Sequence, residues 1–177
     1  SLGKAFLCID DKNIKNILNK TKNKNFYTYG LSKKSNFQIL NVKQKINFSS
    51  FDIKINIPAN KKTIKNIKIP LIGMHNVKNV TSALAVAFSI GISEKIIKKG
   101  LIDFKGVQRR FSYLFKHNKA IFVDDYAHHP TEISSVLDGV KEVYRKKEII
   151  CVFQPHRISR VKSLKLEFSK CFKKAHT

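Results

Sequence analysis

The chain has 177 residues, 42% of them hydrophobic, with 35 lysines and arginines against 12 aspartates and glutamates, a formal net charge of +23. This length and apolar content favour a globular protein of one domain or two small ones and argue against disorder. No apolar run approaches the roughly 20 residues of a membrane span, and the first residues show no signal-peptide pattern. Because no Met begins the chain, we expect a piece of a longer protein.

The first 70 residues predict strands around one helix. KAFLCID (4–10) is typical of a buried strand, and the residues after it predict a helix over 11–20 with Asp10 or Asp11 as N-cap. NFYTYG (25–30) predicts another strand. Between residues 36 and 70 apolar and polar residues alternate, which predicts three antiparallel strands joined by turns such as PANKK.

After residue 70 the spacing of the apolar residues changes from that of a strand to that of a helix. HNVKNVTSALAVAFSIGI (75–92) carries small apolar residues on nearly every face after Val80, which predicts a helix buried on most sides and ended by Gly91. Ser93 is the expected N-cap of a second helix. We place a domain boundary in FKGVQRRF (104–111), dividing residues 1–107 from 108–177.

The last 60 or so residues predict the order β-α-β-α. KAIFVDDY (119–126) and KEIICVFQ (147–154) are the strands, a helix opened by Pro130 lies between them, and residues 163–175 form the last helix. This order is typical of the start of an open parallel sheet, so the fold class is α/β. In such sheets ligands bind beyond the carboxyl ends of the strands.

Two polar clusters follow these two strands. In DDYAHHP, Asp124 and Asp125 could accept ribose hydroxyls or hold a cation, and His128 and His129 precede a helix N-terminus that favours an anion. In the alternative interpretation, Thr131 or Asp125 caps the helix and the histidines are merely solvated. In QPHRISR, the basic residues suit a small anionic substrate; they are His156, Arg157 and Arg160.

Two further stretches carry polar candidates. GMHNVKNVTSAL (73–84) places His75, Asn76 and Asn79 at the start of a helix, where Asn amides could bind a purine edge or simply cap the helix. Arg109 and Arg110, at the predicted boundary, could stabilise a transferred phosphoryl group or form surface ion pairs.

The stretches GMHNVKNVTSALAVA, FKGVQRRF, VDDYAHHPTEI and FQPHRISR resemble, in order and spacing, the Mur ligases of peptidoglycan synthesis. The resemblance covers nearly the whole chain and is nearest to the alanine-adding branch, since the ligase that recycles murein tripeptide departs from QPHR. It implies the C-terminal part of a central ATPase domain (1–107), then the first half of a Rossmann-like C-terminal ligase domain (108–177). The implied activity is ATP-dependent ligation of L-alanine to the carboxylate of UDP-N-acetylmuramate through an acyl phosphate.

The resemblance also implies roles for single residues. It assigns ATP contacts to His75, Asn76, Asn79, Arg110 and Asp125. It assigns catalytic roles to His128, Arg157 and Arg160. It assigns substrate contacts to Tyr126, His129 and His156.

The chain departs from the family by omission. Nothing matches the phosphate-binding pattern G-x-x-G-K-[ST], and the family's Mg²⁺ ligands would lie before residue 1. We therefore expect ATP and Mg²⁺ as cofactors of the intact protein, no metal site in this chain, and no activity from the chain alone. UDP-N-acetylmuramate and L-alanine are the expected small-molecule partners, without specific nucleic acid or membrane insertion, and the oligomeric state stays open.

Two rival functions remain. The net charge of +23 would suit a basic nucleic-acid-binding module, although the lysines are spread among Asn and Ile along the whole chain rather than focused on one face. The second rival function is that of a ligase-derived fragment that has no catalytic activity and serves only in interaction. Three scattered cysteines, Cys8, Cys151 and Cys171, predict no disulfide framework and fit a reducing, cytoplasmic location.

Overall fold

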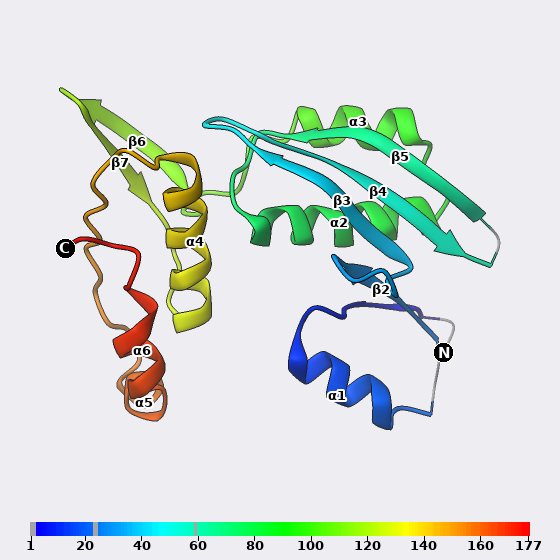
Figure 1. Ribbon diagram of the computed structural model, residues 1–177, viewed down its shortest axis with the longest axis horizontal. Helices are drawn as coiled ribbons and strands as arrows, with labels where there is room; N and C mark the ends of the chain where they lie inside the picture. The colour runs from blue at the N-terminus through cyan, green and yellow to red at the C-terminus, as the bar shows by residue number, and fades with distance from the viewer. Residues whose placement is uncertain (1–2, 23–24, 59) are drawn as a thin grey trace. The chain divides into compact units, whose positions relative to one another are not determined.

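The computed structural model describes residues 3–22, 25–58 and 60–177 (Figure 1). The chain forms two compact units. Unit 1 contains Ser1–Leu71 and Asn76–Phe104, and unit 2 contains Ile72–His75 and Lys105–Thr177.

Unit 1 is built on a five-stranded mixed sheet of order β1–β2–β3–β4–β5. The strands are Ala5–Cys8, Phe26–Gly30, Phe37–Gln44, Ser49–Ile57 and Asn60–Ile69. β1, β2 and β3 pair in parallel, whereas β3, β4 and β5 pair antiparallel. The predicted antiparallel strands within 36–70 are confirmed, and their alternation buries one set of side chains, as in β4, where every second residue from Ser49 to Ile57 is buried.

Three helices belong to this part of the chain: α1 (Lys12–Lys20), α2 (Met74–Ser89) and α3 (Glu94–Ile102). Asp11 is the N-cap of α1, and its Oδ1 accepts from the backbone N–H of Asn13 at 2.8 Å. Ser93 takes the N-cap position of α3 without a side-chain capping bond.

The expectation that α2 is buried on most sides is wrong. Its buried residues recur three or four apart, and Val86 is 41% exposed. α2 is therefore amphipathic, with one apolar stripe. The stripe consists of Val77, Val80, Thr81, Leu84 and Ala85. Beyond its end, Gly91 has φ +89°, and the Ile92 N–H donates to the Ala87 carbonyl at 3.0 Å, as expected of a glycine at a helix C-terminus.

Unit 2 contains a β-hairpin and three helices. The hairpin pairs β6 (Ser112–His117) antiparallel with β7 (Ala120–Asp124). The helices are α4 (Pro130–Val143), α5 (Ile158–Ser163) and α6 (Lys165–Cys171). β6 and α5 were not predicted from the sequence, whereas β7, α4 and α6 were.

The predicted strand over 147–154 is wrong, and no parallel pair forms among the described residues of unit 2. The backbone of this segment bonds instead to the last residues of the chain. The His176 N–H donates to the Ile149 carbonyl at 2.8 Å, and the Cys151 N–H donates to the Thr177 carbonyl at 2.7 Å. An apolar run becomes a strand only where a neighbouring strand satisfies its backbone groups.

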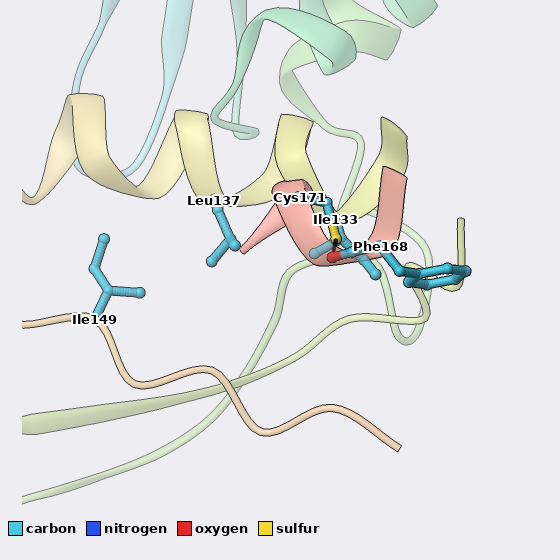
Figure 2. Close-up of a cluster of buried hydrophobic side chains, with 5 residues drawn as sticks. All are labelled: Ile133, Leu137, Ile149, Phe168 and Cys171. Atoms are coloured by element: carbon cyan, nitrogen blue, oxygen red, sulfur yellow. Dashed lines mark hydrogen bonds between the residues drawn. The ribbon is translucent and has the colours of Figure 1, made fainter. Parts of the chain in front are cut away.

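The core of unit 2 lies between α4, α6 and the segment before residue 150 (Figure 2). Ile133 and Leu137, four residues apart on α4, share one helix face. The other members are Ile149, Phe168 and Cys171, of which Cys171 is 5% exposed and acts as a small apolar residue.

Asp52 on β4 joins two irregularities of the sheet. The strand registers shift between Leu40 and Lys43 and between Phe51 and Ile53, and Asn41 and Asn66 have left-handed φ values of 52° and 55°. The Asp52 carboxylate accepts from Asn41 Nδ2 at 2.7 Å and from the Asn66 N–H at 2.7 Å. The bond from Asn41 lowers the pKa of Asp52, burial raises it, and the net shift is downward.

Asp52→Ala should lower the free energy of unfolding by about 1–2 kcal/mol, because two hydrogen bonds to a charged acceptor are lost. A carboxyl whose pKa is lower in the folded state stabilises the fold above its unfolded pKa, and this contribution disappears as the pH falls through the folded pKa. Urea unfolding at neutral and acidic pH should therefore show a difference from wild type that shrinks on acidification. Lys54→Ala, an exposed change on the same strand, is the control; equal stability of Asp52→Ala and wild type at neutral pH would contradict the assignment.

Candidate active site

Asp125 ties together the two loops at the end of β7. Its Oδ2 accepts the Phe111 N–H at 2.8 Å, and its Oδ1 accepts the Ala127 N–H at 2.7 Å. The Tyr126 N–H donates to the Arg109 carbonyl at 2.6 Å and adds a third bond between the same loops. Arg109 and Phe111 have φ values of 58° and 50°, so the loop before β6 is held in a backbone conformation that non-glycine residues seldom adopt.

Four side chains next to these loops contact one another in series: Asp124, Arg109, Tyr126 and His128. Arg109 Nε lies 3.4 Å from Asp124 Oδ2, and the Arg109 guanidinium lies 4.7 Å from the centre of the Tyr126 ring. The Tyr126 and His128 rings meet edge to face at 5.1 Å. The surface ion pair considered for the two arginines therefore holds for Arg109, whereas Arg110 is exposed without a salt bridge among the described residues.

His75, at the start of α2 but within unit 2, approaches Asp125 and Arg110. Burial lowers the pKa of His75; the Asp125 carboxylate and a hydrogen bond with the Ser135 backbone raise it, Arg110 lowers it, and the net shift is downward. The ring is therefore neutral at pH 7. Its Nδ1 is buried without a hydrogen-bond partner in the described part of the chain.

Gly73 makes room for this imidazole. It has φ +92°, and a Cβ placed on it would lie 2.6 Å from His75 Cε1 and 2.8 Å from Nδ1. Gly139 of α4 packs on the same turn, since its Cβ would lie 3.0 Å from the Gly73 Cα. Gly73 requires glycine because of its left-handed φ and the clash with the His75 ring, whereas a Cβ on Gly139 would make a tight contact with the Gly73 backbone.

The two adjacent histidines sit at the N-terminus of α4. His129 is the N-cap, and its Nδ1 accepts the Thr131 N–H at 3.2 Å, so neither Thr131 nor Asp125 caps the helix as the alternative interpretation proposed. Glu132 completes a capping box: its Oε2 accepts the N–H groups of His128 at 3.0 Å and of His129 at 3.2 Å. The helix therefore uses the histidine pair and Glu132 as one structural group.

Of the QPHRISR residues, Arg160 reaches this group. Its Nη1 donates to the His128 carbonyl at 3.2 Å. Arg157 has φ 63° and is the N-cap residue of α5, and its carbonyl accepts the Arg160 N–H at 3.0 Å. His156 and the Arg157 side chain are exposed, and no side-chain contact joins them to the histidine pair within the residues that the structure describes.

The remaining predicted residues, Asn76 and Asn79, belong to unit 1 and lie in the first two turns of α2, half-buried and exposed respectively. Sequence reasoning missed Glu132 and Ser135. The spacing from His129 to Glu132 matches the capping-box pattern except that the cap is histidine rather than Ser or Thr, and that spacing was the available signal. Ser135 contributes only a backbone group, which leaves no sequence signal.

We also searched the described residues for a metal cluster, a membrane span and a cavity at the predicted site. No three His, Cys, Asp or Glu side chains in the described ranges gather as metal ligands would. Across residues 3–22, 25–58 and 60–177, none of the helices has the length and apolar character to cross a bilayer. A cavity near the C-terminus holds none of the predicted site residues; its walls are Cys151, Phe172, Ala175, His176 and Thr177.

Gly73→Ala should destabilise unit 2 by roughly 1–3 kcal/mol, because it adds backbone strain and a clash with His75. Urea unfolding followed through unit-2 amide signals would measure the loss. Gly100→Ala in α3 is the matched control: nothing lies within 4 Å of its Cβ position, so it should stabilise by about 0.5–1 kcal/mol. Equal behaviour of the two variants would contradict the role given to Gly73.

Asp125→Ala should free the loop before β6. Hydrogen bonds to a charged acceptor contribute about 1.5–3 kcal/mol, so the Phe111 and Ala127 amides should exchange about tenfold faster or more with solvent deuterium. Asp124→Ala removes only an exposed ion pair and should change exchange at both amides by no more than about twofold. Unchanged protection in Asp125→Ala would rule out the clamp.

The chain is similar in sequence to known protein families and to known enzymes. The family model described as Mur ligase middle domain matches residues 1–87, and the one described as Mur ligase, glutamate ligase domain, matches residues 109–176. A UDP-N-acetylmuramate–L-alanine ligase of Pelagibacter ubique is 60% identical over 176 residues, which cover 99% of this chain and 38% of that relative. The enzyme of that name from Brachyspira hyodysenteriae is 39% identical over 180 residues, covering 98% and 37%.

Solved structures agree. The UDP-N-acetylmuramate–alanine ligase of Thermotoga maritima has a TM-score of 0.70 at 30% identity, covering 84% of this chain and 32% of that one. A pseudomurein peptide ligase type C from Methanothermus fervidus has a TM-score of 0.74 at 21% identity, covering 97% and 40%, and this likeness concerns the fold alone. The chain spans 38% and 37% of the two sequence relatives named above. With both family models matched in order along it, the chain belongs to the Mur ligase family.

Proposed function

We propose that this chain is part of an ATP-dependent ligase that joins L-alanine to the carboxylate of UDP-N-acetylmuramate in peptidoglycan synthesis. The observation that carries the proposal is the 60% identity, over 99% of the chain, to a relative of that name. The Asp125 junction and the histidine pair supply site chemistry consistent with it. In this assignment residues 1–107 belong to the ATP-binding domain and 108–177 to the C-terminal ligase domain.

ATP suits the residues around His75. A neutral imidazole with a buried, unpartnered nitrogen lies close to a carboxylate that can accept ribose hydroxyls and to a guanidinium that can pair with phosphate. Asn76 and Asn79, which belong to unit 1, are proposed by themselves as purine-edge contacts, since their amides both donate and accept. These residues would hold the nucleotide, and ATP would supply the phosphoryl group that activates the muramoyl carboxylate.

Mg²⁺ is proposed to be held by residues outside this chain, and in the described ranges no three His, Cys, Asp or Glu side chains lie together as its ligands. We assign no residue of this chain to the metal. The electrostatic role within the chain falls to arginine, since a guanidinium can stabilise negative charge that develops in the transition state.

The amino-acid end of the reaction is assigned to the other cluster. We propose that the reacting groups are contacted by His128, Arg157 and Arg160. Of these, Arg160 donates a hydrogen bond to the His128 backbone carbonyl. Tyr126, His129 and His156 are proposed to contact substrate. Guanidinium and imidazole groups here would orient the carboxylate of the amino acid so that its amine faces the activated acyl group.

Location and partners follow from the same proposal. The three cysteines are free in the structure, which fits a reducing cytoplasm. The high positive charge would attract nucleic acids through salt-sensitive contacts, but we propose no specific nucleic-acid partner.

A chimera tests the activity. Replacing the matching 176 residues of the Pelagibacter ubique ligase with this chain should retain L-alanine-dependent phosphate release in the presence of ATP and UDP-N-acetylmuramate. Retention within about tenfold is expected, because substitutions distant from the site cost only small free energies. The same chimera carrying Asp125→Ala, which loosens the loop junction, should lose at least about 100-fold in kcat/KM.

The control is Lys54→Ala in the chimera, an exposed change that should leave turnover unchanged. A folded chimera with ATP hydrolysis that does not respond to L-alanine would refute the proposed substrate. Nucleic-acid binding that has a steep salt dependence and survives the loss of Asp125 and His128, in a folded chimera without ligase activity, would favour the rival binding function instead.

A further inference from the structure

The proton of the His129 ring is assigned by its capping bond. A backbone N–H can only donate, and the Thr131 N–H points at His129 Nδ1 at 3.2 Å. His129 Nδ1 must therefore present a lone pair, and in the neutral ring the proton resides on Nε2.

The His128 ring is assigned in the opposite sense. Its Nδ1 lies 2.9 Å from the Tyr126 carbonyl oxygen, which can only accept. His128 Nδ1 must therefore carry the proton, and in the neutral ring Nε2 presents a lone pair.

Charged neighbours reinforce this arrangement. Glu132 Oε2 lies 3.7 Å from His128 Nδ1, where a carboxylate favours an N–H over a lone pair. Burial raises the pKa of Glu132, but the His128 and His129 N–H groups and the two nearby rings lower it, and the net shift is downward, so Glu132 is ionised. Arg160 donates to the His128 carbonyl rather than to its ring, and the Arg109 guanidinium lies over the Tyr126 ring.

We propose that His128 and His129 are held in opposite neutral tautomers, His128 as Nδ1–H and His129 as Nε2–H, by the Tyr126 carbonyl, the Thr131 amide and Glu132. Tyr126, Thr131 and Glu132 are positioning residues in this scheme. Neither Nε2 takes part in a hydrogen bond within the described part of the chain, so each remains available to a ligand.

The two available nitrogens have complementary chemistry. Nε2 of His128 accepts a hydrogen bond, and Nε2–H of His129 donates one. An α-amino acid carries both matching groups, an ammonium that donates and a carboxylate that accepts. This consequence rests on the proposed function; the tautomers themselves do not.

The tautomers are measured by long-range ¹H–¹⁵N correlation NMR of the ¹⁵N-labelled 177-residue chain without substrate. The spectrum is recorded at about pH 8.5, well above the pKa of about 6.5 at which an imidazole ordinarily titrates. The expected result is a protonated-type shift for His128 Nδ1 and for His129 Nε2, with unprotonated-type shifts for the other two nitrogens. His128→Gln and His129→Gln identify the signals among the six histidines.

A matched pair of variants isolates the capping bond. Thr131→Pro removes the N–H at a first-turn position where proline is tolerated, whereas Thr131→Ala keeps it. His129 should shift to a mixture of tautomers in Thr131→Pro and stay as Nε2–H in Thr131→Ala, with His128 unchanged in both.

A wild-type spectrum with the same tautomer for both histidines overturns the proposal, as does an unchanged His129 in a Thr131→Pro chain whose α4 signals persist. The wild-type spectrum decides alone if Thr131→Pro fails to fold. Because no substrate is present, this result is independent of the chimera's activity: loss of ligation with opposite tautomers intact would refute only the proposed function.

Discussion

The candidate site depends on the Asp125 carboxylate, which accepts one backbone N–H from each of two loops. Without it, Phe111 would have no reason to hold a left-handed backbone, since a bulky residue there is otherwise disfavoured. That conformation places the Arg109 carbonyl and guanidinium against Tyr126, and Tyr126 in turn provides the carbonyl that His128 contacts. The two hydrogen bonds accepted by Asp125 therefore position, through Arg109 and Tyr126, the histidine pair.

Scarce carboxylates recur in this role throughout the chain. With 12 acids against 35 basic residues, exposed acids could simply pair with lysines, yet several accept backbone N–H groups instead. Asp10 accepts from the Leu31 N–H at 3.0 Å beside Gly30, whose φ is +145°, and also pairs with Lys78 at 3.0 Å. Burial raises the pKa of Asp10, but these partners outweigh it and the net shift is downward. A fixed backbone donor holds a carboxylate more specifically than a mobile lysine side chain does.

The histidine pair shows how one helix terminus serves structure and chemistry together. Histidine is an unusual N-cap, and the same bond that caps α4 also leaves the His129 proton on the other nitrogen. A cap made by Ser or Asp would also accept a backbone N–H of the helix but would offer no second nitrogen to a ligand. The structural requirement of the helix therefore sets the protonation pattern that the site presents.

The sequence by itself determined what depends on local periodicity and on short motifs. Alternation specified β3, β4 and β5, the N-cap of α1 was narrowed to Asp10 or Asp11, of which Asp11 takes the position, and the motif stretches indicated the family. Only the tertiary structure decided the rest, because it depends on partners far apart in the chain. The run 147–154 is not a strand because no strand pairs with it among the described residues, and its Ile149 carbonyl and Cys151 N–H bond to residues 176 and 177 instead. The pKa of His75 is lowered mainly by burial; Arg110, 35 residues away in sequence, adds to this shift and Asp125, 50 residues away, opposes it.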